Sequence, residues 1–300
     1  MRSHTQPSQP DSPGRRPAAS TRVDAVIPAA VDAAWLACHL DRTVVADVRW
    51  YLDGRSGLDA YRSGHIPGAV FVDLDRCLSA PPSAEEGRHP LPTPEHFAAA
   101  MSALGIADAD TVVAYDDAGG VIAARLVWML RVTGHPAALL DGGLAAWTGT
   151  GALERATAER SPATFSARPW PREHLATLDE VARATAPLID ARSRARYRGE
   201  PDPADPRHGH IPGARSLPCR ENLGPDGRLL PITELRRRFL AAGVDGSVPV
   251  ISYCGSGVTA CHNLLAFELA GLPAGRLYPG SWSQWGSDAG RPIATGDEPG

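Results

Sequence analysis

One segment of the sequence combines a nucleophilic side chain with a backbone that suits a bound anion. Residues 254–260 read Cys-Gly-Ser-Gly-Val-Thr-Ala, directly after the apolar run 248–253. A helical pattern over residues 261–269 follows the segment and stops before Gly271. This order predicts that Cys254 lies at the carboxyl end of a buried strand, on a tight turn into a helix, where open α/β sheets bind their ligands.

The turn after Cys254 favours the thiolate form of that cysteine. Gly255 and Gly257 let the backbone fold closely around the sulfur. Successive N–H groups of residues 255–259 can then form an anion nest, and the positive end of the following helix adds to their field. We therefore predict that Cys254 is a nucleophile and that Ser256 donates a hydrogen bond to the sulfur or to a substrate.

Other cysteine chemistries match the sequence poorly. Protein tyrosine phosphatases also place a cysteine before a phosphate-binding loop, but they need an arginine six positions later, where this chain has Ala260. No CxxC pair occurs, so the sequence supports neither a zinc site nor a disulfide framework. The remaining cysteines lack the strand–turn–helix context and are expected to be structural: Cys38, Cys77, Cys219 and Cys261.

The elements that must position this cysteine alternate between strands and helices. Short β-branched runs at 44–48 and 111–115 are typical of buried parallel strands. Thr93 and Pro94 predict the start of a helix that stops near Gly105. The alternation predicts an α/β fold in which each parallel sheet is flanked by helices on both faces.

The chain also repeats itself. The sequence Gly-His-Ile-Pro-Gly-Ala occurs at 64–69 and again at 209–214. The motifs Asp-Val-Arg at 47–49 and Asp-Ala-Arg at 190–192 precede these segments in the same order, each at the end of a short apolar run. A repeat of this length is a whole domain rather than a solenoid unit. The sequence therefore predicts two similar α/β domains.

Composition along the chain suggests the domain boundaries. Residues 1–22 are rich in Pro, Ser and Arg, which predicts a disordered leader without the apolar core of a signal peptide. The first domain is expected at 23–155 and a proline-rich linker at 156–175. The second domain, which contains Cys254, is expected at 176–300.

Overall composition argues against two classes of protein. The 300 residues carry a formal net charge of −4, which gives poor support to a nucleic-acid partner. No run approaches the roughly 18 apolar residues that span a bilayer, so no membrane partner is expected. The five cysteines are odd in number and widely spaced, which favours a reduced, cytoplasmic protein.

With these motifs the chain resembles the rhodanese sulfurtransferase superfamily in its tandem-domain form. The resemblance rests on the two Gly-His-Ile-Pro-Gly-Ala segments, the two strand-end motifs, the Cys254 segment and the paired Trp282 and Trp285. It covers about residues 30–297 and implies two rhodanese-like domains. The Gly-Ser pair after the cysteine is similar to the 3-mercaptopyruvate group of the family, whereas the thiosulfate group typically carries Arg-Lys there.

The resemblance implies roles for further residues. The expected substrate-binding residues are Arg196 and Arg207, as partners of a carboxylate, with Gly255, Gly257, Val258 and Thr259 of the loop. The family draws a histidine and an acid from the first domain, for which His65 and Asp59 are the candidates. Asp116 replaces the cysteine in the first domain, which is therefore expected to be catalytically inactive.

Together the motifs and the resemblance predict a sulfurtransferase. Cys254 takes the sulfur of 3-mercaptopyruvate as a persulfide and releases pyruvate, and thioredoxin, another thiol or cyanide accepts the sulfur. No metal and no organic cofactor is implied. A thiosulfate:cyanide sulfurtransferase is the alternative enzyme. A non-enzymatic sulfur carrier or interaction module is the alternative from another class, against which the presence of the cysteine argues.

Overall fold

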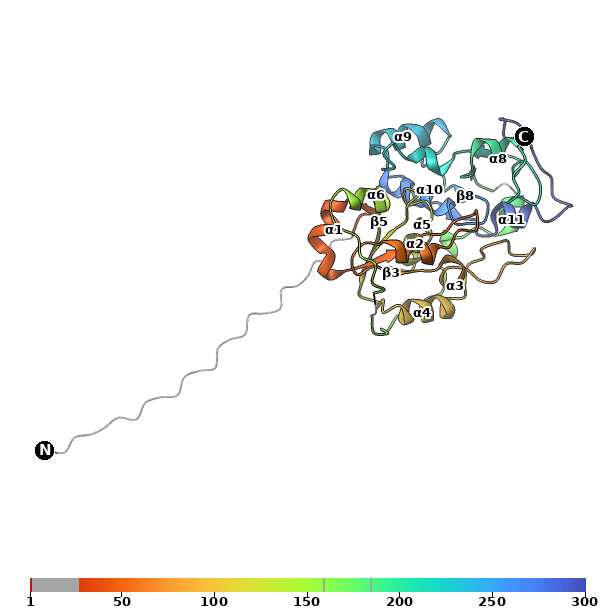
Figure 1. Ribbon diagram of the computed structural model, residues 1–300. Coiled ribbons are helices and arrows are strands. Elements are labelled where there is room, and N and C mark those ends of the chain that lie inside the picture. The colour runs from red at the N-terminus through yellow and green to blue at the C-terminus, as the bar shows by residue number, and fades with distance from the viewer. Residues whose placement is uncertain (2–26, 159, 184) are drawn as a thin grey trace.

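The computed structural model describes Met1 and residues 27–158, 160–183 and 185–300. Two α/β units pack against each other, and in Figure 1 the first runs from red to yellow-green and the second from green to blue. Each is built on a parallel sheet with helices on both faces, which confirms the predicted fold class. Within these described ranges, no helix is long and apolar enough to cross a membrane.

The first sheet has five parallel strands. They are β1 (Ala30–Val31), β2 (Thr43–Asp47), β3 (Val70–Phe71), β4 (Thr111–Tyr115) and β5 (Ala137–Leu140). Their order is β1-β5-β4-β2-β3. The central strands β2 and β4 form at the two predicted runs, because helices cover both faces of the sheet and a continuous apolar run suits that burial.

Seven helical segments surround the first sheet. They are α1 (Ala33–His39), η1 (Leu40–Arg42), α2 (Gly57–Ser63), α3 (Leu74–Cys77), α4 (Pro94–Ala103), α5 (Ala124–Val132) and α6 (Gly143–Thr148). Leu36 of α1 and Trp147 of α6 pack on one face, and Phe97 of α4 packs with α5 on the other. Helix α4 begins at the predicted cap, where the Thr93 side chain accepts the N–H of His96.

The second sheet has the same strand order as the first, except that a single bridge replaces the strand equivalent to β1. Its strands are β6 (Leu188–Asp190), β7 (Ala214–Ser216), β8 (Ile251–Tyr253) and β9 (Arg276–Leu277), in the order β7-β6-β8-β9. A parallel bridge between Leu175 and Leu277 stands where β1 lies in the first sheet. Strand β8 is shorter than the predicted run, because Val248 is exposed and Pro249 has no N–H for the ladder.

The second domain joins the first through a shared core. Its helical segments are η2 (Arg172–His174), α7 (Leu178–Ala182), α8 (Arg194–Arg198), η3 (Cys219–Asn222), α9 (Ile232–Ala241), α10 (Ala260–Leu269) and α11 (Ser281–Trp285). Tyr197 of α8 and Trp282 of α11 pack on one face of the sheet. On the other face α10 packs against α5, so apolar residues of both domains form one continuous core.

The strand-end motifs brace the two sheets in the same way. In the first domain the carboxylate of Asp47 pairs with Arg49 at 2.6 Å, and in the second Asp190 pairs with Arg192 at 2.6 Å. Each arginine also donates to the carbonyl of the glycine before His-Ile-Pro, at 2.8 and 2.7 Å. All four side chains are buried. These residues therefore fix the local backbone, and their repetition supports a duplicated domain.

The remaining boundaries stay predictions. The proposed leader, residues 1–22, lies outside the described residues apart from Met1. Within the proposed linker, the described backbone from 160 to 171 forms neither helix nor strand. Leu175, at the end of that linker, already pairs with the second sheet.

Candidate active site

Cys254 lies between a strand and a helix, at the carboxyl end of the strands of the second sheet, on the side that faces the first domain. Strand β8 ends at Tyr253, and α10 begins at Ala260. The cysteine is 2% exposed and lines a cavity of about 850 Å³. The structure brings four other predicted loop residues to this cavity, namely Gly255, Ser256, Val258 and Thr259.

Gly257 has a different position in the loop. It adopts a left-handed φ of 77°, and a Cβ placed on it would lie 2.5 Å from the carbonyl oxygen of Pro279. The residue does not line the cavity. Its carbonyl instead accepts a hydrogen bond from Arg125 of the first domain at 2.9 Å. Gly257 therefore shapes the loop rather than contacting a molecule in the cavity.

The backbone of Cys254 is held by a serine in an unusual conformation. The N–H of Cys254 donates to the Ser281 Oγ at 3.2 Å, and that hydroxyl donates to the carbonyl of Tyr278 at 2.9 Å. Ser281 has a φ of 52°, the left-handed region that favours glycine, and it is fully buried. Gly143 holds the equivalent position in the first domain with a φ of 55°. Only the cysteine-bearing domain therefore has a hydroxyl here.

This contrast supplies a test. We expect Ser281→Gly, which copies the first domain, to relieve backbone strain and to lose the two hydroxyl hydrogen bonds, so that the thermal unfolding temperature changes little. The same change removes the acceptor for the N–H of Cys254, so the alkylation rate of Cys254 by iodoacetamide should fall about fivefold. An unchanged alkylation rate in a stably folded variant would show that the hydroxyl does not position the cysteine.

The first domain shows what its equivalent loop does with a carboxylate. The side chain of Asp116 is fully buried and accepts the N–H groups of Ala118, Gly120, Ile122 and Ala123 at 2.7–2.9 Å. Burial raises the pKa of Asp116, and the four N–H groups oppose that rise. The nest is thus filled by the protein's own anion, in keeping with the expectation that this domain is catalytically inactive.

A chain of hydrogen bonds leads from the loop into the first domain. The Ser256 Oγ lies 2.7 Å from the Nδ1 of His89, and the Nε2 of His89 lies 3.2 Å from the Oδ1 of Asp75. Because a carboxylate only accepts, Nε2 carries the proton and Nδ1 accepts the Ser256 hydroxyl. The indole N–H of Trp50 donates to the other Asp75 oxygen at 2.9 Å. Ser256, His89 and Asp75 therefore form a hydrogen-bonded chain that ends in the cavity.

The environment sets the charge of this chain. Burial lowers the pKa of His89, and the charge of Arg88 lowers it further, although Asp75 opposes both. The hydrogen bond from His89 lowers the pKa of Asp75. The resting site therefore holds a neutral imidazole beside a carboxylate, which is the state in which a histidine can accept a proton.

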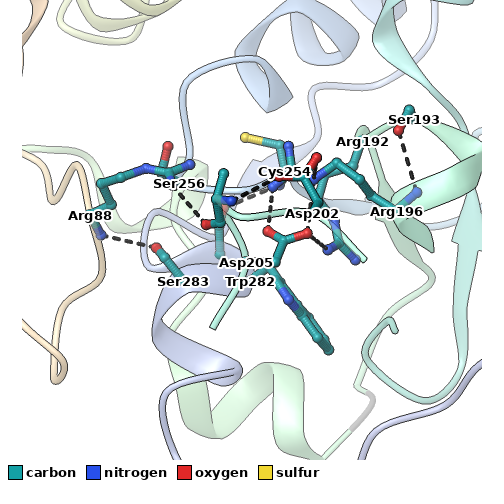
Figure 2. Close-up of polar contacts among 12 residues, drawn as sticks. Arg88, Arg192, Ser193, Arg196, Asp202, Asp205, Cys254, Ser256, Trp282 and Ser283 are labelled. Atoms are coloured by element: carbon teal, nitrogen blue, oxygen red, sulfur yellow. Dashed lines mark hydrogen bonds and ion pairs between the residues drawn. The ribbon is translucent and has the colours of Figure 1, made fainter. Parts of the chain in front are cut away.

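Two guanidinium groups approach the loop from opposite domains. A Cβ placed on Gly255 would lie 3.2 Å from a terminal nitrogen of Arg88 and 3.2 Å from one of Arg196. In Figure 2 the Cys254 side chain lies between the Arg88 side chain and those of Arg192 and Arg196. The cysteine thus faces a positively charged part of the cavity.

The two groups differ in how far their charge is already balanced. Arg196 pairs with Asp205, which also accepts from Arg192 at 3.1 Å, and its Nε lies 3.4 Å from the Oδ2 of Asp202. Arg88 donates to the carbonyl of Ala204 at 2.9 Å, and no described carboxylate pairs with it. Burial lowers the pKa of Arg88, and the neighbouring charge of Arg196 lowers it further. Of these two arginines, Arg88 is therefore the one that an incoming anion stabilises more.

Three predicted site residues do not reach the cavity. Arg207 donates to the carbonyls of Gly286 at 2.9 Å and Asp288 at 2.6 Å, so its guanidinium anchors the segment after α11. His65 stacks on Tyr61, and its Nδ1 contacts the Tyr61 carbonyl at 2.8 Å, as His210 does with Tyr197 in the second domain. The Asp59 side chain is 75% exposed on α2. The structure therefore does not bring Arg207, His65 and Asp59 to the candidate site.

Sequence reasoning missed Arg88, His89 and Asp75. Asp75 follows the short strand β3 and lies in α3, so an acid just past a strand end was a usable signal. Arg88 and His89 had no such signal, because they lie in a loop outside any helix or strand. Ser83 and Gly87 close that loop by exchanging backbone hydrogen bonds. That loop rests on the second domain, where the Ser283 Oγ accepts the N–H of Arg88 at 2.9 Å.

The described part of the chain contains no group of three or more His, Cys, Asp or Glu side chains that could hold a metal ion. The chemistry available at the site is that of a thiol, a hydroxyl, an imidazole and two guanidinium groups. This set can attack an electrophilic sulfur, bind an anion and relay a proton.

Known proteins resemble the chain over most of its length. The model of the rhodanese-like domain matches residues 32–150 and 172–288. A probable 3-mercaptopyruvate sulfurtransferase of Pseudomonas aeruginosa is 46% identical over 263 residues, which cover 85% of this chain and 93% of the relative. The thiosulfate/3-mercaptopyruvate sulfurtransferase 1 of Arabidopsis thaliana mitochondria is 37% identical over 281 residues, which cover 83% of this chain and 73% of that relative.

A solved structure agrees with these relatives. The 3-mercaptopyruvate sulfurtransferase from Leishmania major matches with a TM-score of 0.76 and 34% identity, covering 85% of this chain and 73% of that one. Both repeats of the present chain thus match one domain family, in the order and at the places where the structure has its two sheets. The chain belongs to the rhodanese family and contains two rhodanese-like domains.

Proposed function

We propose that the chain is a sulfurtransferase that moves sulfur from 3-mercaptopyruvate through a Cys254 persulfide to a thiol or cyanide and releases pyruvate. The observation that carries the proposal is the Cys254 loop, which faces Arg88 and Arg196 and joins the Ser256–His89–Asp75 chain in one cavity. Close relatives named for this reaction support the same substrate.

The first half-reaction moves one sulfur atom. The Cys254 thiolate attacks the sulfur of 3-mercaptopyruvate, an S–S bond forms, and the C–S bond breaks with its electron pair on carbon. The leaving group is the enolate of pyruvate, which needs one proton at carbon. The substrate thiol supplies a proton, because the persulfide is left as an anion. Thiolate and substrate therefore give persulfide anion and pyruvate with no proton gained or lost.

The Ser256–His89–Asp75 chain suits that proton transfer. Neutral His89 draws the Ser256 hydroxyl proton toward Nδ1, so the oxygen can accept the proton of the substrate thiol. The hydroxyl then returns a proton to the enolate carbon. Asp75 holds the ring in the required tautomer and stabilises any imidazolium that forms. Backbone N–H groups of the loop stabilise the thiolate and persulfide anions.

The two arginines suit the substrate carboxylate. Arg88 has no described carboxylate partner, whereas Arg196 already shares Asp205 with Arg192. The substrate anion therefore gains most from Arg88, and Arg196 adds a second set of donors. When the two arginines hold the substrate carboxylate, the keto acid lies beside the loop and the substrate thiol points toward Cys254.

Removing the Arg88 charge should weaken substrate binding. We expect Arg88→Gln to raise KM for 3-mercaptopyruvate about 10- to 100-fold with a smaller change in kcat, because a charge-assisted bond to the substrate is lost. Arg55→Gln is the matched control: Arg55 lines the same cavity but is exposed and paired with Asp53 at 2.9 Å. Steady-state pyruvate release measures both variants. An unchanged KM for Arg88→Gln contradicts the assignment.

The second half-reaction returns Cys254 to its sulfur-free thiolate form. An acceptor thiolate attacks the outer persulfide sulfur, the S–S bond breaks, and Cys254 leaves as a thiolate. We propose a small thiol, a protein thiol such as thioredoxin, or cyanide as the acceptor. A cytoplasmic location suits this chemistry, because a reducing compartment keeps both the acceptor and Cys254 as thiols.

Thiosulfate is the second candidate donor. Two guanidinium groups near Gly255 also suit a sulfonate-bearing dianion, and the Arabidopsis relative is named for both donors. Parallel assays of sulfur transfer to cyanide with the two donors test the choice. We expect kcat/KM to be higher with 3-mercaptopyruvate. A strong preference for thiosulfate would overturn the donor while leaving the persulfide chemistry in place.

A further inference from the structure

The most unusual charge in the molecule is a buried arginine of the inactive domain. Arg125 lies on α5 and is fully buried. Its guanidinium crosses the domain boundary to donate to the carbonyl of Gly257 at 2.9 Å. The same group donates to the carbonyls of His89 at 3.2 Å and Leu78 at 3.4 Å. One side chain thus contacts the Cys254 loop and the segment that carries His89.

This charge has no acidic partner in the described part of the chain. No described Asp or Glu forms an ion pair with Arg125, and its Nε has no hydrogen-bond partner there. An uncompensated buried charge is costly, because carbonyl oxygens replace only part of its hydration. Burial accordingly lowers the pKa of Arg125, while Cys261 and Cys254 oppose that effect. Cys261 and Cys254 are therefore the ionisable groups that act on this charge.

Cys254 is the one of these two thiols that can provide a negative charge. The sulfur of Cys261 lies beside Arg125 and donates to the Gly257 carbonyl at 3.4 Å. Burial raises the pKa of Cys261 to about 12, so it stays a neutral thiol near neutral pH. Cys254 is the nucleophile of the proposed reaction, which starts from its thiolate and leaves it as a persulfide anion. Other ionisable groups at or near the Cys254 cavity include Arg88, His89, Asp117, Arg192, Arg194, Arg196, Asp205, Cys219, Arg220 and Glu221.

We infer that Arg125 is a positioning residue that holds the Cys254 loop across the domain boundary and helps to balance the charge of the thiolate and persulfide anions. The part of the inference that concerns the persulfide rests on the proposed function. The part that concerns the thiolate does not. It also gives the inactive first domain a further part in the site. Through one guanidinium, docking of the two domains is coupled to the geometry of the loop and to the position of His89.

The test measures Cys254 without any sulfur donor. The rate of alkylation by iodoacetamide is followed against pH, and mass spectrometry of peptides reports modification of Cys254 alone. We expect Arg125→Gln to raise the pH of half-maximal alkylation by about one unit, because a nearby positive charge is lost. This readout stands even if both proposed donors prove wrong, so its failure and that of the proposed function are distinguishable.

Arg131→Gln is the matched control. Arg131 lies on the same helix and also crosses the domain boundary, where it pairs with Glu268 away from the Cys254 cavity. We expect this variant to lose some thermal stability and to keep the wild-type alkylation profile. If Arg131→Gln shifts the profile as far as Arg125→Gln, loosened domains explain the effect and the inference fails. It fails equally if Arg125→Gln leaves the profile unmoved.

A second variant covers the possibility that Arg125→Gln does not fold. Arg125→Lys keeps the charge but cannot donate to Gly257 and His89 at once, because lysine lacks the planar fork. We expect Arg125→Lys to keep the alkylation profile near that of the wild type and to lower kcat with 3-mercaptopyruvate about tenfold. A folded Arg125→Lys enzyme with unchanged kcat would overturn the positioning role.

Discussion

We expect Cys254→Ser to lose sulfur transfer with every donor while keeping the wild-type fold. Serine has nearly the same size and can keep the N–H contact to Ser281, so thermal unfolding should change little. A hydroxyl in this loop is far less nucleophilic than a thiolate and forms no stable bond to the incoming sulfur. Removal of a covalent nucleophile typically costs at least about 10³-fold in kcat, and we expect a loss of that size.

Cys38→Ser controls for nonspecific thiol chemistry. Cys38 is exposed on α1, outside the residues that line the cavity, and its loss should leave turnover unchanged. Pyruvate release and sulfur transfer to cyanide are measured for both variants. Turnover that persists in Cys254→Ser, or that vanishes in Cys38→Ser, would place the nucleophile elsewhere.

The second large effect is expected at His89. His89→Asn removes the base that accepts the Ser256 proton, and loss of a general base typically costs 10²–10⁴-fold, so we expect kcat to fall by about 10² or more. Ser256→Ala should cost a similar factor. The double variant should lose little beyond either single change, because the two side chains act as one chain.

The pH profile tests the same assignment. Burial lowers the pKa of His89 below its ordinary 6.5. The reaction requires neutral His89, so kcat should hold at pH 7 and fall as the pH drops through that lowered value. In His89→Asn the contribution of His89 to this acid limb should disappear, and any limb that remains should match the pH profile of Cys254 alkylation. His135→Asn is the control, since His135 is also buried and contacts Asp108 at 3.3 Å, away from the cavity. An acid limb that is the same in His89→Asn as in the wild type would contradict the role.

The parts of the site that could be predicted are local ones. The Cys254 turn needs a strand, two glycines and a helix that are contiguous in the sequence, so its pattern suffices to place it. The duplication was equally readable, because Gly-His-Ile-Pro-Gly-Ala keeps its order relative to each strand-end motif. The fold class followed from these same local patterns, and the two parallel sheets confirm it.

The residues that could not be predicted come from the other domain. Arg88 and His89 reach the Cys254 loop only because their segment docks on Ser283, nearly two hundred positions away. No local pattern encodes that contact. Arg207 shows the converse: a charge in a suitable loop is not a site residue when backbone carbonyls already take up its donors.

The most direct test of the account is the mass of the intact protein after brief mixing with 3-mercaptopyruvate and no acceptor. The account predicts a gain of one sulfur atom, localised to Cys254 in peptides, with one pyruvate released per protein. Thiosulfate is mixed in parallel. If the protein gained sulfur from thiosulfate alone, thiosulfate would be the donor in place of 3-mercaptopyruvate. No sulfur gained from either donor, with Cys254 intact and reduced, would contradict the persulfide mechanism and leave a binding role for the two rhodanese-like domains.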